Sequence, residues 1–170
     1  MIKRSKIIKK IKAAFRYGRV IALLGPRQCG KTTLARMFVS AGLESYFDLE
    51  DPADGEKLSQ PKSALADLKG TVVIDEVQRQ PAIFPVLRVL ADRDPLPAKF
   101  LILGSASPEL VRHSSESLAG RLARVLLGGF SLEEVGQKFF KKHWVRGGLP
   151  LSFLAGSDEE SFAWRKDYIE

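Results

Sequence analysis

Residues 25–32 have the types and spacing of a loop that binds phosphate groups. The stretch fits the pattern G-x-x-x-x-G-K-[ST] at every fixed position, with glycine at 25 and 30 followed by Lys31 and Thr32. Glycines let a backbone wrap a phosphate without Cβ clashes, while loop amides and a helix N-terminus direct N–H donors at it. We therefore predict that the phosphates of a nucleotide bind to Gly25, Pro26, Arg27, Gln28, Cys29, Gly30, Lys31, Thr32 and Thr33.

Three side chains of this loop have distinct expected roles. Lys31 supplies a mobile positive charge between the β- and γ-phosphates, Thr32 places its hydroxyl on Mg²⁺, and Thr33 reaches the α-phosphate. Each charge-assisted hydrogen bond is worth about 1.5–3 kcal/mol, so the phosphates rather than the base should dominate affinity. The Asn-Lys-x-Asp motif that reads guanine does not occur in the sequence. The predicted ligand is therefore ATP with Mg²⁺.

An acidic pair supplies the second half of this chemistry. Asp75 and Glu76 directly follow the apolar run Thr71–Ile74. A buried strand that ends in an acid places the carboxylate at the sheet edge where ligands bind in open α/β folds. We expect Asp75 to hold the Mg²⁺ through its water shell and Glu76 to activate water for in-line attack on the γ-phosphorus. Gln78 either assists Glu76 or is a solvated loop residue.

Other polar residues are candidates for the same site. Ser105, with Ser107 as second choice, either orients the attacking water or belongs to a helix N-cap before Pro108. Arg121 is a candidate to stabilise the transition-state charge, and the alternative is an ordinary surface charge beside a strand. Arg124 is a weaker candidate for that role. Arg27 is expected to face solvent or a partner.

The elements that must position these residues alternate between short apolar runs and helical patterns. Five apolar runs are expected to form strands, at 20–24, 46–50, 71–74, 100–103 and 122–127. Helices are expected from residue 30 or 31 to near 42, from 81 to the loop at 92, and from 108 to 118, with a loop and a short helix across 53–68. This alternation predicts an α/β fold in which helices cover both faces of a parallel sheet.

Length and composition limit the class of protein. The chain has 170 residues, enough for one ordinary domain with a small appendage, and 45% of them are hydrophobic. No apolar run approaches the roughly 20 residues that span a bilayer, so we expect no membrane span. The single cysteine, Cys29, excludes an internal disulfide, and no signal peptide is recognisable. We therefore expect a cytoplasmic location.

The net charge of +7 comes from the N-terminal segment. Residues 1–19 contain eight Lys or Arg and no acid, whereas the remainder has 19 basic and 20 acidic residues. Ile7, Ile8, Ile11 and Phe15 recur at helical spacing, which predicts a basic amphipathic helix over 1–16. Either its apolar stripe packs on the domain, or it is an arm that binds DNA or another anionic surface.

The sequence beyond residue 130 has a different pattern. Residues 131–134 and 157–160 both match the capping-box pattern of a helix start, and a Gly/Pro turn at 146–150 separates them. We expect a helical tail outside the sheet and divide the chain into 1–16, 17–130 and 131–170. Because the helical pattern continues to Glu170 without a C-cap signal, we expect the natural protein to extend further.

Taken in order, the motifs resemble those of a known family. They are GPRQCGKTT, DLEDP, VIDEVQ, LGSAS, SLAGR and GFSLEE, and they span roughly residues 15–136. The chain resembles the prokaryotic AAA-type P-loop ATPases, in which a C-terminal domain of unknown function follows the ATPase domain. The resemblance implies a five-stranded parallel sheet, with the strand that carries Asp75 not adjacent in sequence to the loop strand, and ATP hydrolysis. It also implies phosphate and Mg²⁺ roles for Lys31 and Thr32, metal binding for Asp75, water activation for Glu76 and a polar sensor at Ser105.

Two functions remain open from the sequence. The first is Mg²⁺-dependent ATP hydrolysis that drives or times a conformational change. The second is an ATP-bound switch, in signalling or in a DNA-associated assembly, with negligible hydrolysis until a protein partner or a second copy supplies an arginine. A phosphotransferase is less favoured, because Glu76 beside Asp75 suits water activation.

Overall fold

Five parallel strands form the centre of the molecule. The computed structural model describes residues 2–39, 45–95, 97–105 and 116–170. The strands lie in the order β2-β3-β4-β1-β5, and each paired neighbour is parallel. Their bounds are β1 Val20–Leu24, β2 Tyr46–Asp48, β3 Gly70–Asp75, β4 Ala98–Gly104 and β5 Leu122–Leu126. The predicted five-stranded parallel sheet is confirmed.

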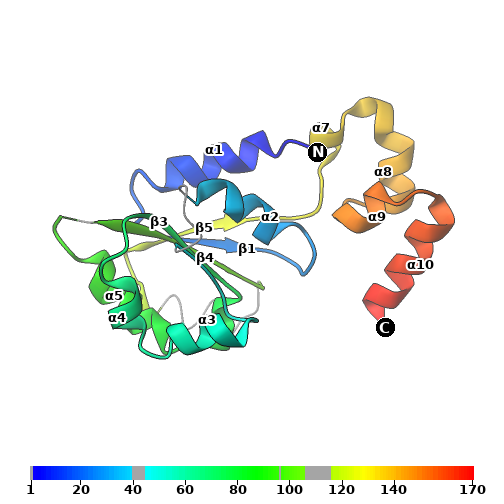
Figure 1. Cartoon of the computed structure of the whole chain (residues 1–170). Coiled ribbons are helices and arrows are strands. Elements are labelled where there is room, and N and C mark those ends of the chain that lie inside the picture. The colour runs from blue at the N-terminus through cyan, green and yellow to red at the C-terminus, as the bar shows by residue number, and fades with distance from the viewer. Residues whose placement is uncertain (1, 40–44, 96, 106–115) are drawn as a thin grey trace.

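Helices cover both faces of the sheet (Figure 1). On one face, α1 (Ser5–Ala14) and α2 (Lys31–Ala35) share a buried cluster with Ile21, Leu23 and their neighbours on the sheet. On the other face, α5 (Ile83–Ala91) packs on a cluster that includes Ala22 and Ile74. It lies beside the short helices α3 (Pro52–Lys57) and α4 (Pro61–Leu65). The predicted three-layer α/β/α arrangement is therefore confirmed.

The N-terminal basic helix packs on the domain. Ile11 and Ala14 of α1 are fully or almost fully buried, and Ile7, Ile8 and Phe15 pack against the same cluster. Its lysines at 6, 9, 10 and 12 are exposed. The apolar stripe is thus part of the core, while the exposed lysines leave anion binding as a separate question.

The segment after β2 begins with a helix where a loop was expected. Helix α3 (Pro52–Lys57) begins directly after Asp51, whose carboxylate accepts a hydrogen bond from the Ala53 N–H at 2.9 Å. Proline at the first helical position needs no N–H partner, so the Asp-Pro pair acts as a helix start. Helix α4 (Pro61–Leu65) begins with proline in the same way.

Two expected helices extend into ranges that the structure does not describe. After α2 the chain continues as a 3-10 turn, η1 (Arg36–Phe38), and Val39 is extended, so the helical run ends earlier than the expected position near 42. Most of the helix expected over 108–118 falls within 106–115. Another 3-10 turn, η3 (Val77–Arg79), follows β3. Within the described ranges, every helix is too short or too polar to cross a lipid bilayer.

Residues 131–170, hereafter the helical segment, form short helices beside the end of the sheet at which β1 finishes (Figure 1). They comprise α7 (Leu132–Val135), the 3-10 turn η4 (Gln137–Phe139), α8 (Phe140–Arg146), α9 (Pro150–Leu154) and α10 (Asp158–Ile169). The capping box at Ser131 is complete. At Ser157 only half of it forms, because Glu160 accepts from the Gly156 N–H instead of that of residue 157.

Candidate nucleotide-binding site

The loop between β1 and α2 has backbone geometry that requires its two glycines. A Cβ on Gly25 would lie 2.0 Å from the Leu127 carbonyl oxygen, so no larger residue fits there. Gly30 has φ of +93°, in the left-handed region that side chains rarely adopt. The loop therefore depends on both glycines to make its turn against β5 and to enter α2.

Lys31 is folded across the loop that precedes it. Its Nζ donates to the carbonyl oxygens of Gly25 and Pro26, at 3.2 and 2.9 Å, and the residue is 5% exposed. The ammonium charge is therefore held by carbonyl dipoles at the mouth of the loop. A phosphate oxygen is a stronger acceptor than these carbonyls, and a lysine side chain is long enough to turn toward one.

Thr32 and Asp75 meet although they lie on different elements. The Thr32 hydroxyl donates to Asp75 Oδ2 at 2.6 Å, and the Glu76 N–H donates to Oδ1 at 2.9 Å. Asp75 is 2% exposed at the end of β3. A hydroxyl and a carboxylate are the hard oxygen donors that suit Mg²⁺, which binds proteins through one or two carboxylates together with substrate phosphates and water. Within the described ranges no three His, Cys, Asp or Glu side chains gather as a cage, so a metal here would rely on such shared coordination.

Tyr46 is a third partner of Asp75 that sequence reasoning missed. Its hydroxyl donates to Asp75 Oδ2 at 2.8 Å, from the first residue of β2. Burial, followed by the hydrogen bond to Asp75 and the charge of this carboxylate, raises the pKa of Tyr46 far above its ordinary value, so the hydroxyl stays a donor. The Arg36 guanidinium lies over the Tyr46 ring, 5.4 Å from its centroid. Only the pairing of β2 with β3 brings these residues together, and no local motif signals it.

Glu76 and Gln78 lie together just beyond β3. Glu76 has φ of +52°, and its carboxylate accepts a hydrogen bond from Gln78 Nε2. Gln78 Oε1 is buried and has no hydrogen-bond partner among the described residues. Of the two roles considered for Gln78, contact with Glu76 is the one that matches its position.

Ser105 lies at the same edge of the sheet as the loop. It directly follows β4, in which Gly104 pairs in register with Leu24, and the Gly25 N–H donates to the Gly104 carbonyl at 3.4 Å. Ser107, the second choice, lies outside the described residues.

The structure does not bring Arg121 to this site, so of the two roles left open for it, the position matches an ordinary surface charge beside a strand rather than contact with the phosphates. Leu122, the next residue, pairs with Val20 at the start of β1, whereas the loop begins after Leu24. At 3.3 Å per residue, Arg121 is therefore about 20 Å along the sheet from the loop. Its guanidinium instead binds both carboxylate oxygens of Asp92, at 2.6 and 2.7 Å. Arg124 pairs in register with Ala22, midway along the strand.

Two arginines do lie near the loop, on its exposed rim. Arg27 is within 3.8 Å of Glu50, and Arg79 is within 3.0 Å of the same carboxylate. The three side chains are all half-exposed or more. Such exposed ion pairs are weak, so both arginines are free to exchange partners. Arg27 faces outward, as predicted.

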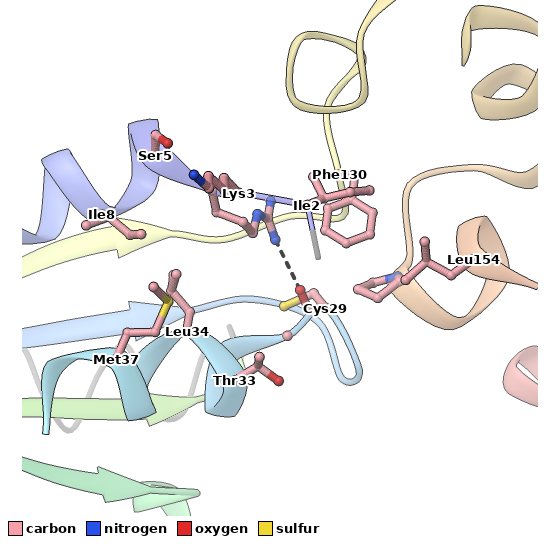
Figure 2. Close-up of a pocket in the computed structure, with 13 residues that line it drawn as sticks. Ile2, Lys3, Ser5, Ile8, Cys29, Thr33, Leu34, Met37, Phe130 and Leu154 are labelled. Carbon is pink, nitrogen blue, oxygen red and sulfur yellow. Dashed lines mark hydrogen bonds between the residues drawn. The ribbon is translucent and has the colours of Figure 1, made fainter.

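A cavity of about 640 Å³ adjoins the loop at Cys29 and Gly30 (Figure 2). Its walls come from the N-terminal residues before and within α1, from Cys29, Gly30 and the first turns of α2, and from Phe130, Pro150 and Leu154. Cavities of this size hold small ligands, and a mainly apolar lining suits a flat aromatic ring. Burial raises the pKa of the Cys29 thiol, which keeps it neutral in this wall. The loop motif predicted the phosphate end of such a site, but not this wall.

The helical segment contacts the loop directly. The Tyr168 hydroxyl of α10 donates to the Arg27 carbonyl oxygen at 3.1 Å. Pro150 lies 3.9 Å from the position that a Cβ on Gly30 would take. Leu149 packs against the buried cluster beneath α1 and α2. The predicted tail is helical, and it closes one side of the cavity.

Comparison with known proteins agrees with this architecture. Two curated relatives, both uncharacterized proteins, come from Mycobacterium bovis and Mycobacterium tuberculosis; each is 50% identical to the chain over 169 residues, or 99% of it. The chain spans 38% of the length of each relative. The solved Walker-type ATPase PABY2304 of Pyrococcus abyssi has the same fold, with a TM-score of 0.66 at 14% identity over 99% of this chain and 72% of that one.

A family profile decides the classification. The profile is described as an AAA domain and matches residues 17–136, well over half of the chain. This range contains the loop at 25–32, the Asp75-Glu76 pair and the whole five-stranded sheet. The chain therefore belongs to the AAA-type family of P-loop ATPases.

Proposed function

We propose that this domain binds and hydrolyses ATP in a Mg²⁺-dependent reaction. The observation that carries the proposal is the 2.6 Å contact between Thr32 Oγ1 and Asp75 Oδ2, next to a lysine held at the mouth of a glycine loop. Mg²⁺, when bound, would neutralise negative charge that develops on the phosphate groups. Thr32 and Asp75 would hold it, and Lys31 would bind the β- and γ-phosphates.

We assign Glu76 the role of general base, which accepts the proton of the attacking water. Its carboxylate is an acceptor at the carboxyl edge of the sheet, and Gln78 Nε2 fixes its orientation by a hydrogen bond. A carboxylate oxygen is a group that can accept a proton from water. We assign Ser105, one residue beyond β4 at the same edge, the role of orienting that water.

The adenine base is assigned to the cavity of about 640 Å³ beside Cys29 and Gly30. Its apolar walls exclude water from the flat faces of a purine, while the phosphates follow the loop toward Asp75. Since parts of the wall come from the helical segment, ATP binding would also contact α9. This contact supports the use of the ATP cycle to drive or time movement of the helical segment.

Phosphate release tests the assignment of Glu76. The Glu76→Gln variant should bind ATP with an affinity within about threefold of the parent chain and lose turnover by roughly 10²-fold or more, the scale expected for losing a general base. Glu56→Gln on the exposed surface of α3 is the matched control and should keep full turnover. Equal turnover in Glu76→Gln would remove Glu76 from the reaction.

A second candidate function is an ATP-bound switch that hydrolyses only with a partner's arginine. It is favoured by the position of Arg121, which is held by Asp92 at the amino end of β5. An arginine supplied from outside raises phosphoryl-transfer rates by about 10³–10⁵-fold. Stoichiometric bound ATP with near-zero turnover at every protein concentration would favour the switch, whereas turnover that is constant per molecule on dilution favours the ATPase.

A further inference from the structure

Arg4 is buried at a junction between segments that are far apart in the sequence. It is 8% exposed, although it belongs to the basic N-terminal segment whose lysines are solvated. Its guanidinium has five N–H donors, and five hydrogen bonds leave it. Two go to the Glu134 carboxylate at 3.0 and 3.2 Å, and three go to the carbonyl oxygens of Cys29, Gly128 and Gly129 at 2.9–3.2 Å.

These acceptors belong to the parts that would surround a bound nucleotide. Cys29 lies in the phosphate loop, the two glycines follow β5, and Glu134 lies in α7, the first helix of the helical segment. The guanidinium also lies over the Phe130 ring, 5.3 Å from its centroid. Arg4 and Phe130 both line the cavity assigned to the base. Figure 2 shows Phe130 in its wall.

The bond to Cys29 acts on a peptide group of the loop itself. A trans peptide is planar, and its N–H points opposite to its C=O. Holding the Cys29 carbonyl at 3.2 Å therefore fixes the direction of the Gly30 N–H, one of the proposed phosphate donors. The same side chain thus orients a loop amide and anchors α7.

We propose that Arg4 is a positioning residue that couples the nucleotide site to the helical segment, by holding the Cys29–Gly30 peptide and α7 in one hydrogen-bonded junction. The inference rests on the proposed function, since it requires that the chain binds ATP. Binding of ATP beside Gly30 and Phe130 then stabilises α7, and displacement of α7 loosens the loop.

Lysine cannot replace arginine in this role. An ammonium has three N–H donors and no planar fork, so it cannot reach two carboxylate oxygens and three carbonyls together. The Arg4→Lys variant keeps the charge and loses the geometry. Lys6 and Glu133 provide a matched control, because they form an ion pair between the same two segments with side chains 67% and 66% exposed.

The test measures ATP affinity and hydrogen exchange on the whole chain. ATP should slow amide exchange at residues 132–135 in the parent protein and in Lys6→Gln. In Arg4→Lys, affinity should fall about ten- to hundredfold, the equivalent of one or two charge-assisted hydrogen bonds, and this protection should disappear. Unfolding midpoints recorded without ATP confirm that each variant is folded at the temperature used.

The possible results distinguish a failure of this inference from a failure of the proposed function. Parent-like affinity or retained ATP-dependent protection of α7 in Arg4→Lys would overturn the inference, whereas a parent chain that binds no ATP would overturn the proposed function. If Arg4→Lys does not fold, Glu134→Gln replaces it, because it removes the charge and one of the two acceptors on the α7 side and leaves the Cys29 bond. Glu134→Gln should keep affinity within about threefold and lose the protection; retained protection would again contradict the coupling.

Discussion

Thr32 and Asp75 lie 43 positions apart in the sequence and meet at the carboxyl edge of the sheet, where the threonine hydroxyl donates to the aspartate carboxylate at 2.6 Å. Because both oxygens are assigned to Mg²⁺, Asp75→Asn should lower turnover by about 10²-fold or more, as loss of one pre-positioned electrostatic group does. Phosphate release over a Mg²⁺ titration checks this prediction. Asp67→Asn, on the exposed surface after α4, should behave as the parent chain.

The hydroxyl of Tyr46 should contribute to stability through Asp75. Tyr46→Phe removes one donor from a buried carboxylate, so the free energy of unfolding should fall by about 1 kcal/mol or somewhat more. Urea unfolding at neutral pH measures the change. Tyr17→Phe is the control, because Tyr17 is 77% exposed. An equal effect of the two substitutions would mean that the Tyr46–Asp75 hydrogen bond has no net effect on stability.

Glycine at position 30 is required by backbone conformation. Gly30→Ala should destabilise the chain by about 1–2 kcal/mol, because a left-handed φ is sterically unfavourable for alanine. The substitution should also weaken ATP binding. Gly55 lies within α3 with no atom near its missing Cβ. Gly55→Ala should therefore stabilise the chain by about 0.5–1 kcal/mol. Thermal unfolding of both variants tests the contrast, and a stabilising Gly30→Ala would contradict it.

These predictions separate what local sequence reveals from what it does not. The glycine loop and the acid after β3 are local sequence patterns, so the strands and the helix beside them could be predicted from the sequence. Tyr46 bonds to Asp75, which lies 29 positions later in the sequence, and Arg4 bonds to Glu134, which lies 130 positions later. No neighbouring residue in the sequence indicates either contact. The position of Arg121 follows from the fold, because a residue directly before a parallel strand lies at the edge opposite the ligand. Asp51-Pro52 fits both a turn and a helix start, and the N-cap bond decides for the helix.

Stability should depend on pH through Glu134. Burial alone would raise the pKa of this carboxyl, but hydrogen bonds from Arg4 and the Ser131 N–H outweigh it and hold the pKa below its ordinary value. A depressed folded-state pKa adds stability above the unfolded-state value, and this stability is lost as pH falls through the folded-state value. Between these two pKa values, the parent chain should lose more unfolding free energy than Glu134→Gln does. Parallel curves from urea unfolding across this acidic range would contradict the assignment.

The exposed lysines of α1 can be substituted, to test whether they bind DNA, without disturbing the buried core. Removing residues 1–16 would also remove Arg4 and the buried Ile11, so a deletion confuses binding with folding. We propose that Lys9 and Lys10 contribute to binding of duplex DNA. Lys9→Glu with Lys10→Glu should weaken it, and binding by the parent chain should fall steeply with salt, as phosphate contacts do. Fluorescence anisotropy measures both effects, and salt-independent binding would exclude this face.

Phosphate release by the parent chain and by Lys31→Ala, each with Mg²⁺ and with EDTA, tests the central claim most directly. The arrangement of Lys31, Thr32 and Asp75 predicts release that requires Mg²⁺ and falls by about 10²–10³-fold in Lys31→Ala, because that ammonium is assigned to the phosphates. Release that continues at the same rate in EDTA, or in Lys31→Ala, would contradict the assignment of this loop as the site of ATP hydrolysis.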